Sequence, residues 1–327
     1  MKFTLNLPKL ILLLTLSFSF IACEVSGSDA NAPVESLNIV ETAANESDLS
    51  NLVAALGAAE GDLLGVLSGG QYTVLAPNNF AFDIFLADNG FASLDEVPAD
   101  LLQTILLNHV ITGTVSSSDL AAAGNGYATT NATNMDGDNL SMYFTTENGV
   151  VFNGGSSVIA ADVTASNGVI HIVDAVIGLP TVATFVTTNS AFETLLAAGA
   201  SADLTEDFIS ILSTTTDPAP FTVFAPTNDA FGSLLTELGI ESLNDIEPET
   251  LEATLGTHVV VGANVRSTDL TNNMIITTAS ENSLTVLLDA GPQLMDANGR
   301  LANIIGVDIQ AYNGVIHVID KVVLPQL

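Results

Sequence analysis

The chain has 327 residues, of which 48% are hydrophobic and 13% charged, a composition that suits packed domains and excludes disorder over most of its length. The charges are one-sided, because 37 Asp and Glu face only 5 Lys and Arg, which gives a net charge of −32. A surface this acidic repels phosphate backbones and anionic lipid headgroups, so nucleic acid is excluded as a partner.

Residues 1–22 have the pattern of a secretory signal peptide. Lysines supply a basic start, and the apolar run from Leu10 to Ala22 is shorter than a permanent membrane-spanning helix needs. The run leads into Phe20-Ile21-Ala22-Cys23, which resembles a bacterial lipobox, where cleavage precedes a lipid-bearing cysteine. We therefore predict that Cys23 is lipidated. Ordinary signal cleavage after Ser19 is the alternative.

The residues after the leader predict a membrane tether. Cys23 is the only cysteine, so no disulfide can form within the chain. Residues 23–33 are otherwise small, polar and acidic, which is typical of a flexible linker. We expect an exported protein whose only membrane contact is its lipid anchor, either an outer-membrane or cell-surface lipoprotein or a periplasmic protein.

The first globular unit opens with a strand, a turn and a helix. Tyr72 to Phe82 reads YTVLAPNNFAF, in which a β-rich run stops at a proline. Asn78 is placed to cap the helix that follows, and Phe82 and Leu86 recur with helical spacing. Gly90 is the expected C-terminal stop.

A second helix is predicted to begin near Pro98. Within LLQTILLNHV, the side chains of Leu102, Ile105 and His109 fall on one stripe of such a helix. His109 is therefore predicted to face the core.

The back half of this unit is rich in strands. Asp136-Gly137-Asp138-Asn139 predicts a hairpin turn, and its spacing does not fit the calcium loop of an EF-hand, which has glycine in sixth place. Met142 to Phe152 alternates loosely, and Asn167 to Asp174 (NGVIHIVD) is dense in Val and Ile. Helices followed by strands predict an α+β fold.

The same order of motifs then occurs again. FTVFAPTNDAF at Phe221 to Phe231 repeats the first motif with an offset of 149 residues, and NGVIHVID at Asn313 to Asp320 repeats the last with an offset of 146. A unit of about 145 residues has the usual size of an independent domain. We predict two tandem domains, at 34–180 and 181–327, with almost no linker.

The second copy uses different residues for the same local tasks. Thr227 is placed to cap its first helix and Gly239 to end it. Its second helix begins near Pro248 and carries His258 on the apolar stripe.

All four histidines lie at equivalent places of the two copies. His109 corresponds to His258, and His171 corresponds to His317. Their sequence neighbours are mostly Leu, Val and Ile, so a buried imidazole bonded to the backbone explains them better than a metal site. We predict four structural core histidines, no metal and no cofactor.

These motifs resemble those of tandem fasciclin-domain proteins. Members carry T-V-F-A-P-[TN]-[ND]-x-A-F near the start and N-G-x-[IV]-H-x-[IV]-D at the end of each domain, and both motifs occur twice here in order. The resemblance covers nearly all of 34–327. It implies that each domain is a β-sandwich or wedge with flanking helices, used as an extracellular adhesion or interaction module.

The adhesion elements of this family carry over in part. A Tyr-His element falls on Asn108-His109 and Thr257-His258, where both tyrosines are missing, which argues against an integrin as partner. An Asp-Ile element matches Asp308-Ile309, and Asp162-Val163 takes its place in the first copy. The resemblance thus makes these four residues, Asp308, Ile309, Asp162 and Val163, the candidate interaction residues.

The sequence holds no catalytic motif: neither a G-x-S-x-G elbow nor H-E-x-x-H nor a phosphate-binding glycine loop occurs. Our leading hypothesis is a non-enzymatic adhesion or interaction protein on a bacterial membrane, which binds a protein or glycan of the cell surface or matrix. The alternative is an envelope protein that binds a small ligand or a cation. An enzyme that uses a dispersed Ser-His-Asp set is the third hypothesis.

Overall fold

The computed structural model describes residues 36–326. The predicted signal peptide (1–22), the predicted lipidation site Cys23 and the predicted tether (23–33) lie outside the described residues. Among residues 36–326, no single helix is long and apolar enough to cross a membrane. One pair of segments, Ser47–Ala58 and Leu63–Gly69, reaches the length and apolar composition of a membrane span only when the two are taken together, and they are bent by 114° relative to each other.

The first repeat places most of its helices before most of its strands. Its helices span Ile39–Asn45 (α1), Ser50–Ala58 (α2), Leu63–Gly69 (α3), Asn79–Asp88 (α4), Ala99–Asn108 (α5) and Ser117–Ala123 (α6). Its strands span Tyr72–Pro77 (β1), Val110–Thr112 (β2), Asn125–Thr133 (β3), Asn139–Thr145 (β4), Val151–Phe152 (β5), Ser156–Ala165 (β6) and Gly168–Val173 (β7).

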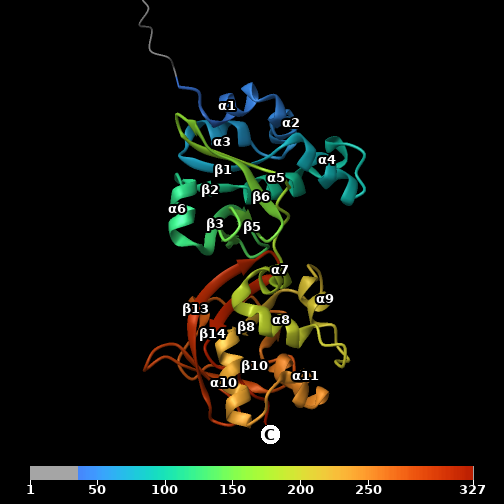
Figure 1. The fold of residues 1–327 in the computed structure, drawn as a ribbon, viewed down its shortest axis with the longest axis vertical. Helices are drawn as coiled ribbons and strands as arrows, with labels where there is room; N and C mark the ends of the chain where they lie inside the picture. Colours follow the sequence, from blue (N-terminus) through green and yellow to red (C-terminus); the bar gives the residue numbers. More distant parts are fainter. Residues whose placement is uncertain (1–35, 327) are drawn as a thin grey trace, which may run out of the picture. The chain divides into compact units, whose positions relative to one another are not determined.

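Strand pairing in the first repeat runs the whole way round, so the sheet closes into a barrel in the order β1 to β7. Strands β1 and β7 pair in parallel, with Tyr72 opposite Gly168, and the other neighbours pair antiparallel. Helices α1, α2 and α3 pack against one another (Figure 1). The predicted wedge is therefore barrel-like in this domain.

The second repeat follows the same order. Its helices span Val182–Thr188 (α7), Glu193–Gly199 (α8), Phe208–Ser213 (α9), Asn228–Leu238 (α10) and Pro248–Thr257 (α11). Its strands span Phe221–Pro226 (β8), Val259–Val261 (β9), Ile275–Thr277 (β10), Ser283–Leu287 (β11), Gln293–Met295 (β12), Leu301–Ala311 (β13) and Gly314–Ile319 (β14).

The sheet of the second repeat has the strand order β10-β11-β12-β13-β14-β8-β9. Strands β8 and β14 pair in parallel, with Phe221 opposite Gly314, as their counterparts do in the first repeat. Helices α7, α8 and α9 pack together as α1, α2 and α3 do. The predicted α+β class and the tandem arrangement are confirmed.

The repeated Asn-Gly pair joins the last strand of each repeat to the helices. Asn313 accepts a hydrogen bond from the N–H of Val182 (2.8 Å), and its amide donates to carbonyls in and after α9. Asn167 makes the matching contacts in the first repeat. A Cβ on Gly314, whose φ is 153°, would lie 2.0 Å from the carbonyl oxygen of Phe221, so only glycine allows this approach.

The helix caps are those that the sequence predicts. Asn78 accepts a hydrogen bond from the N–H of Ala81 (2.8 Å) at the start of α4. Thr227 accepts one from Ala230 (3.3 Å) at the start of α10, which ends at Gly239 with a left-handed φ of 70°. Local capping chemistry therefore fixes where these helices begin and end.

Each repeat buries an apolar core between its helices and its sheet. In the first repeat, Phe82 of α4 packs with Leu102 of α5 and Ile170 of β7. In the second repeat, Phe231 belongs to the same cluster as Leu255. Phe82 and Phe231 are repeat equivalents, so the shared motif supplies a shared core residue.

The two repeats contact each other through the β3–β4 hairpin. The turn predicted at 136–139 is confirmed, and the Asp138 carboxylate accepts a hydrogen bond from Arg266 Nε at 2.6 Å. Beside it, the backbone N–H of Gln310 donates to the Ser141 hydroxyl at 3.0 Å. The acidic turn of the first repeat is thus engaged by a basic side chain of the second.

Candidate functional site

The four candidate interaction residues lie at matching irregularities of two long strands. Asp162 and Val163 lie on β6 and Asp308 and Ile309 on β13, where the pairing with the next strand shifts register. The aspartates have φ angles of 58° and 57°, a left-handed conformation that Asp adopts more readily than most residues. Each repeat therefore places an aspartate where the strand bends.

Each of these carboxylates binds a backbone segment of its own domain. Asp162 accepts hydrogen bonds from the N–H of Ser117 (2.9 Å) and from the Ser117 hydroxyl, at the start of α6. Asp308 does the same with Ser267, whose N–H lies 2.8 Å away. Both aspartates thus hold a turn in place, which is a structural task.

The exposure of the four candidates differs. The side chain of Asp162 is 41% exposed, whereas Asp308 is half-buried. Val163 is half-buried, and Ile309 is only 8% exposed within the core of the second repeat. A partner on the surface can therefore reach Asp162 most easily and Ile309 least.

We expect Asp308→Ala to lower the free energy of unfolding by about 2 kcal/mol, because the change removes charge-assisted hydrogen bonds to Ser267. Urea unfolding of the purified chain measures this loss. Asp308→Asn is the matched control, since Asn tolerates the left-handed backbone and retains an acceptor. Equal stability of the alanine variant and the native chain would show that the carboxylate has no structural task.

His171 and His317 are buried on the last strand of each repeat. His171 Nε2 donates to the carbonyl of Val115 (2.9 Å), and Nδ1 accepts from the N–H of Asp162 (3.2 Å). His317 makes the same two contacts with equivalent backbone groups, at 2.8 and 3.4 Å. Burial lowers the pKa of His317. Each ring therefore connects the bend of the long strand to the segment that begins at Val115 in the first repeat or Val265 in the second. The aspartate at the bend binds the same segment, two residues further on.

His109 and His258 lie at the ends of α5 and α11 and are also buried. His109 Nδ1 donates to the carbonyl of Ile105 (2.7 Å), and Nε2 accepts from the N–H of Ile177 (2.8 Å). His258 makes the equivalent pair of contacts at 2.8 and 3.1 Å. Burial lowers the pKa of both rings to about 4. The rings are therefore neutral near pH 7 and act as structural bridges.

Ser117, Asp162 and His171 are residues of the three types that form a Ser-His-Asp catalytic triad. Their hydrogen bonds, however, do not connect them in the order that a triad requires. The serine hydroxyl donates to the aspartate, and His171 Nδ1 is 4.0 Å from Asp162 Oδ1. Nε2, which would have to activate a serine, is bonded to a backbone carbonyl. The arrangement holds backbone segments together. Among residues 36–326, no group of three or more His, Cys, Asp or Glu could hold a metal ion.

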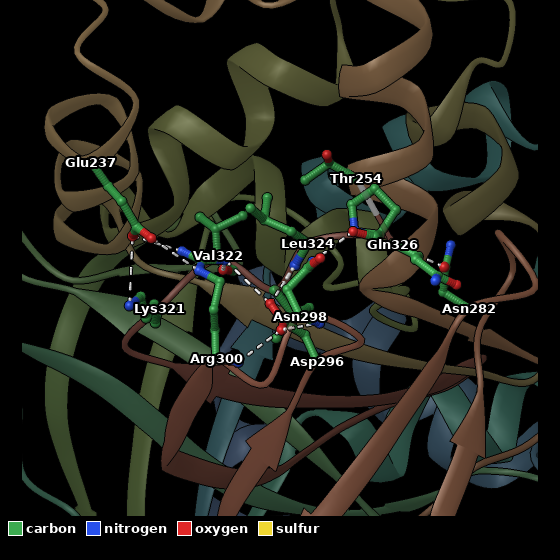
Figure 2. A network of polar contacts seen from close by, with 12 residues as sticks. Glu237, Thr254, Asn282, Asp296, Asn298, Arg300, Lys321, Val322, Leu324 and Gln326 are labelled. Carbon is green, nitrogen blue, oxygen red and sulfur yellow. Dashed lines mark hydrogen bonds and ion pairs between the residues drawn. The ribbon is translucent and has the colours of Figure 1, made fainter.

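An ion-pair network that the sequence did not predict holds the end of the second repeat (Figure 2). Arg300 donates to the carbonyl of Val322 (2.8 Å) and pairs with Glu237 (2.9 Å) and Asp296 (3.3 Å). The side chain of Asp296 is fully buried and also accepts from the N–H of Leu324 (3.0 Å). The network therefore ties the last segment to α10 and to the turn before β13.

All three basic side chains in the described part of the chain take part in ion pairs. Arg266 pairs with Asp138 and Arg300 with Glu237, and Lys321 Nζ lies 3.5 Å from the same glutamate. The many carboxylates exposed elsewhere have no such cations to compensate them. A partner would therefore meet a surface of negative charge.

An apolar groove of about 530 Å³ lies on the second repeat between α9, α11 and β9. Its apolar walls include Phe208, Ile211, Leu212, Ala253, Val259 and Val261. Three carboxylates, of Glu206, Glu249 and Glu252, also line it. No pattern in the sequence indicates this groove, because its lining comes from segments that are separated along the chain.

Comparison with known proteins identifies the two repeats. A sequence model of the fasciclin domain matches residues 47–180 and 190–325, which together make up most of the chain. The chain belongs to the fasciclin domain family. The first fasciclin domain corresponds to the β1–β7 barrel, and the second corresponds to the sheet of β8 to β14.

Curated relatives with fasciclin domains come from animals and bacteria. Transforming growth factor-beta-induced protein ig-h3 of Oryctolagus cuniculus is 29% identical over 261 residues, which are 78% of this chain and 35% of that protein. Protein sll1483 of Synechocystis is 36% identical over 139 residues, 42% of this chain and 70% of the relative. Cell surface glycolipoprotein MPB83 of Mycobacterium bovis is 31% identical over 147 residues, 43% of this chain and 60% of the relative. The chain thus spans about a third of the length of ig-h3.

A solved structure shares the fold. The FAS1 domain pair of the insect cell adhesion molecule Fasciclin I aligns with a TM-score of 0.52 and 20% identity, covering 85% of this chain and 97% of that one. At this identity the likeness concerns the fold alone. The prediction of two tandem fasciclin domains is confirmed.

Proposed function

We propose that this protein is a non-enzymatic adhesion or interaction protein of the bacterial cell envelope. The observation that carries the proposal is the pair of fasciclin domains, which also occurs in a solved cell adhesion molecule. The buried histidines support it, because their ring nitrogens are bonded to the backbone and have no access to a substrate. We infer that binding to another macromolecule is the task of the exposed faces.

The proposed location is outside the cytoplasm, with the chain anchored by a lipid on Cys23. The lipobox-like sequence before this cysteine supports the anchor, and a bacterial relative is named a cell surface glycolipoprotein. The protein would then be an outer-membrane or cell-surface lipoprotein, or face the periplasm.

We expect Cys23→Ser to abolish incorporation of radiolabelled palmitate and to move the protein from the membrane fraction to the soluble exported fraction. The sulfur of the cysteine thiol is the atom that would receive the lipid, and serine keeps the approximate size of the side chain. Ser19→Asn, which alters the alternative cleavage site, should leave labelling unchanged. Palmitate labelling that persists in Cys23→Ser would refute lipidation at this residue.

The proposed partner is a protein or glycan of the cell surface or matrix that presents basic groups or bridges through cations. The basic side chains of residues 36–326 are already paired, so the exposed charge available to a partner is negative. Asp162, Val163, Asp308 and Ile309 remain the proposed contact residues. Asp162 is the most accessible carboxylate among them.

Adhesion is tested with beads that carry the purified mature chain at a fixed density. We expect these beads to bind cells and cell-envelope fractions of the source organism more strongly than beads with an unrelated protein of equal net charge. Asp162→Asn should reduce the difference if Asp162 contacts the partner, whereas Asp136→Asn is a matched surface control. Binding no stronger than that of the charge-matched beads would contradict the proposed function.

A further inference from the structure

The groove on the second domain combines apolar walls with carboxylates. Its volume of about 530 Å³ falls in the range of small-molecule sites. Phe208 and Ile211 of α9 and Val259 and Val261 of β9 line it. Every charged residue that lines the groove is a glutamate.

The first domain carries larger side chains at two equivalent positions of its second helix. With the repeat offset of 149 residues, Leu107 corresponds to Gly256 and Thr104 to Ala253. Leu107 is partly buried and packs against the core of the first domain, whereas Gly256 and Ala253 line the open groove of the second. A Cβ on Gly256 would lie 3.1 Å from the Cβ of Ser280, so the glycine at this position lets Ser280 pack against α11 at the edge of the groove.

The carboxylates of the groove are not all used within the domain. Glu252 accepts hydrogen bonds from the N–H (2.7 Å) and hydroxyl (2.6 Å) of Thr205, and these bonds lower its pKa. The side chains of Glu206 and Glu249 are exposed and form no ion pair within residues 36–326. Two carboxylates beside an apolar wall therefore lack a cation.

A bare metal ion does not suit this arrangement. Among the residues that the structure describes, the acidic side chains do not converge in a group of three that could hold one ion. Carboxylates spread along an apolar groove instead match a cation whose charge is attached to a hydrocarbon body, because the body removes apolar wall from water while the charge stays at the rim.

We propose that this groove binds a small organic cation with an apolar body, of the alkylammonium class. The hydrocarbon lies against Phe208, Ile211 and Val259, and the ammonium group lies between Glu206 and Glu249. This site goes beyond the proposed adhesive function, since a chain that adheres need not bind the cation, and each property is measured separately.

Isothermal titration of the full mature chain with butyl-, hexyl- and octylammonium chloride tests the site. We expect saturable binding of one cation per chain, with affinity that rises by up to about fourfold for each added CH2 group as apolar wall is covered. Octanoate has the same hydrocarbon with the opposite charge and should not bind. Binding of octylammonium should weaken as the salt concentration rises.

Two pairs of variants separate the groove from the general negative charge. E206Q/E249Q should weaken octylammonium binding by about tenfold, whereas E193Q/E241Q removes two carboxylates of the same domain outside the groove and should change it by less than about twofold. Ala253→Leu should abolish binding by filling the groove. Thr104→Leu, which places a leucine at the equivalent position of the first domain, should leave binding intact.

Three outcomes would overturn the proposal. The first is no saturable binding of any of the three alkylammonium ions. The second is equal weakening by both double variants, which would mean diffuse attraction to the acidic surface. The third is binding of octanoate as tight as that of octylammonium, which would mean an apolar site without charge selection. Adhesion of the coated beads is independent of all three.

Discussion

Replacing Asp296 with alanine is expected to lower the free energy of unfolding by about 3–5 kcal/mol. The side chain of Asp296 is fully buried and accepts hydrogen bonds from the N–H groups of Arg300 (2.9 Å) and Leu324 (3.0 Å). Its removal leaves these donors without an acceptor and removes one partner of the Arg300 guanidinium, which is itself only 13% exposed. Urea unfolding at pH 7 measures the change.

The matched control for this prediction is Glu237→Gln. Glu237 contacts the same guanidinium but is 44% exposed, so water replaces the lost charge and the expected cost is below about 1 kcal/mol. Losses of similar size in the two variants would show that burial of Asp296 is not what makes the network important.

The sequence predicts the parts of this fold that depend on local chemistry. The caps at Asn78 and Thr227 follow from side chains that bind backbone two or three residues ahead. The two helices that carry His109 and His258 follow from apolar spacing. The doubled motifs predict the tandem arrangement, because two sets of the same motifs in the same order indicate two copies of the same fold.

The parts that the sequence does not predict depend on distant segments. Arg300 is 63 positions from Glu237, and nothing in the spacing of single charges indicates that they meet. The groove is lined by α9, α11 and β9 together with Ala279 and Ser280, and no local pattern indicates that these segments surround an open space. The strand bends at Asp162 and Asp308 also have no periodic signal, because a bulge interrupts the alternation from which strands are predicted.

Comparing the two domains distinguishes positions that maintain the fold from positions that are free to serve a function. The histidines make the same backbone contacts in both domains, so they belong to the shared scaffold. The acidic hairpin turn of the first domain has no aspartate in the matching stretch of the second, and Gly256 in the groove of the second stands where the first has Leu107. One of these differences, Asp138, is used to join the domains through Arg266. The other is open to solvent and is therefore the better candidate for a ligand.

The buried histidines are expected to make the protein less stable as the pH falls from about 6.5 to about 4. In the folded chain, burial holds the pKa of His109 and His258 near 4, below the ordinary value of 6.5. Between these values the unfolded chain binds a proton that the folded chain does not, so each ring reduces the free energy of unfolding by about 3 kcal/mol over this interval. Above pH 6.5 the full stability is present, and below pH 4 these two rings cause no further loss.

Titrating carboxylates change stability over the same pH range, so the effect of one ring is measured as a difference between two proteins. His258→Gln removes the titration and keeps a side chain that can donate and accept. The native chain should be the more stable at pH 7, because its ring bonds to Thr254 and Val323 fit the site. Its advantage over the variant should shrink by about 3 kcal/mol between pH 7 and pH 4. Parallel curves of stability against pH for the two proteins would mean that His258 does not change its protonation on unfolding.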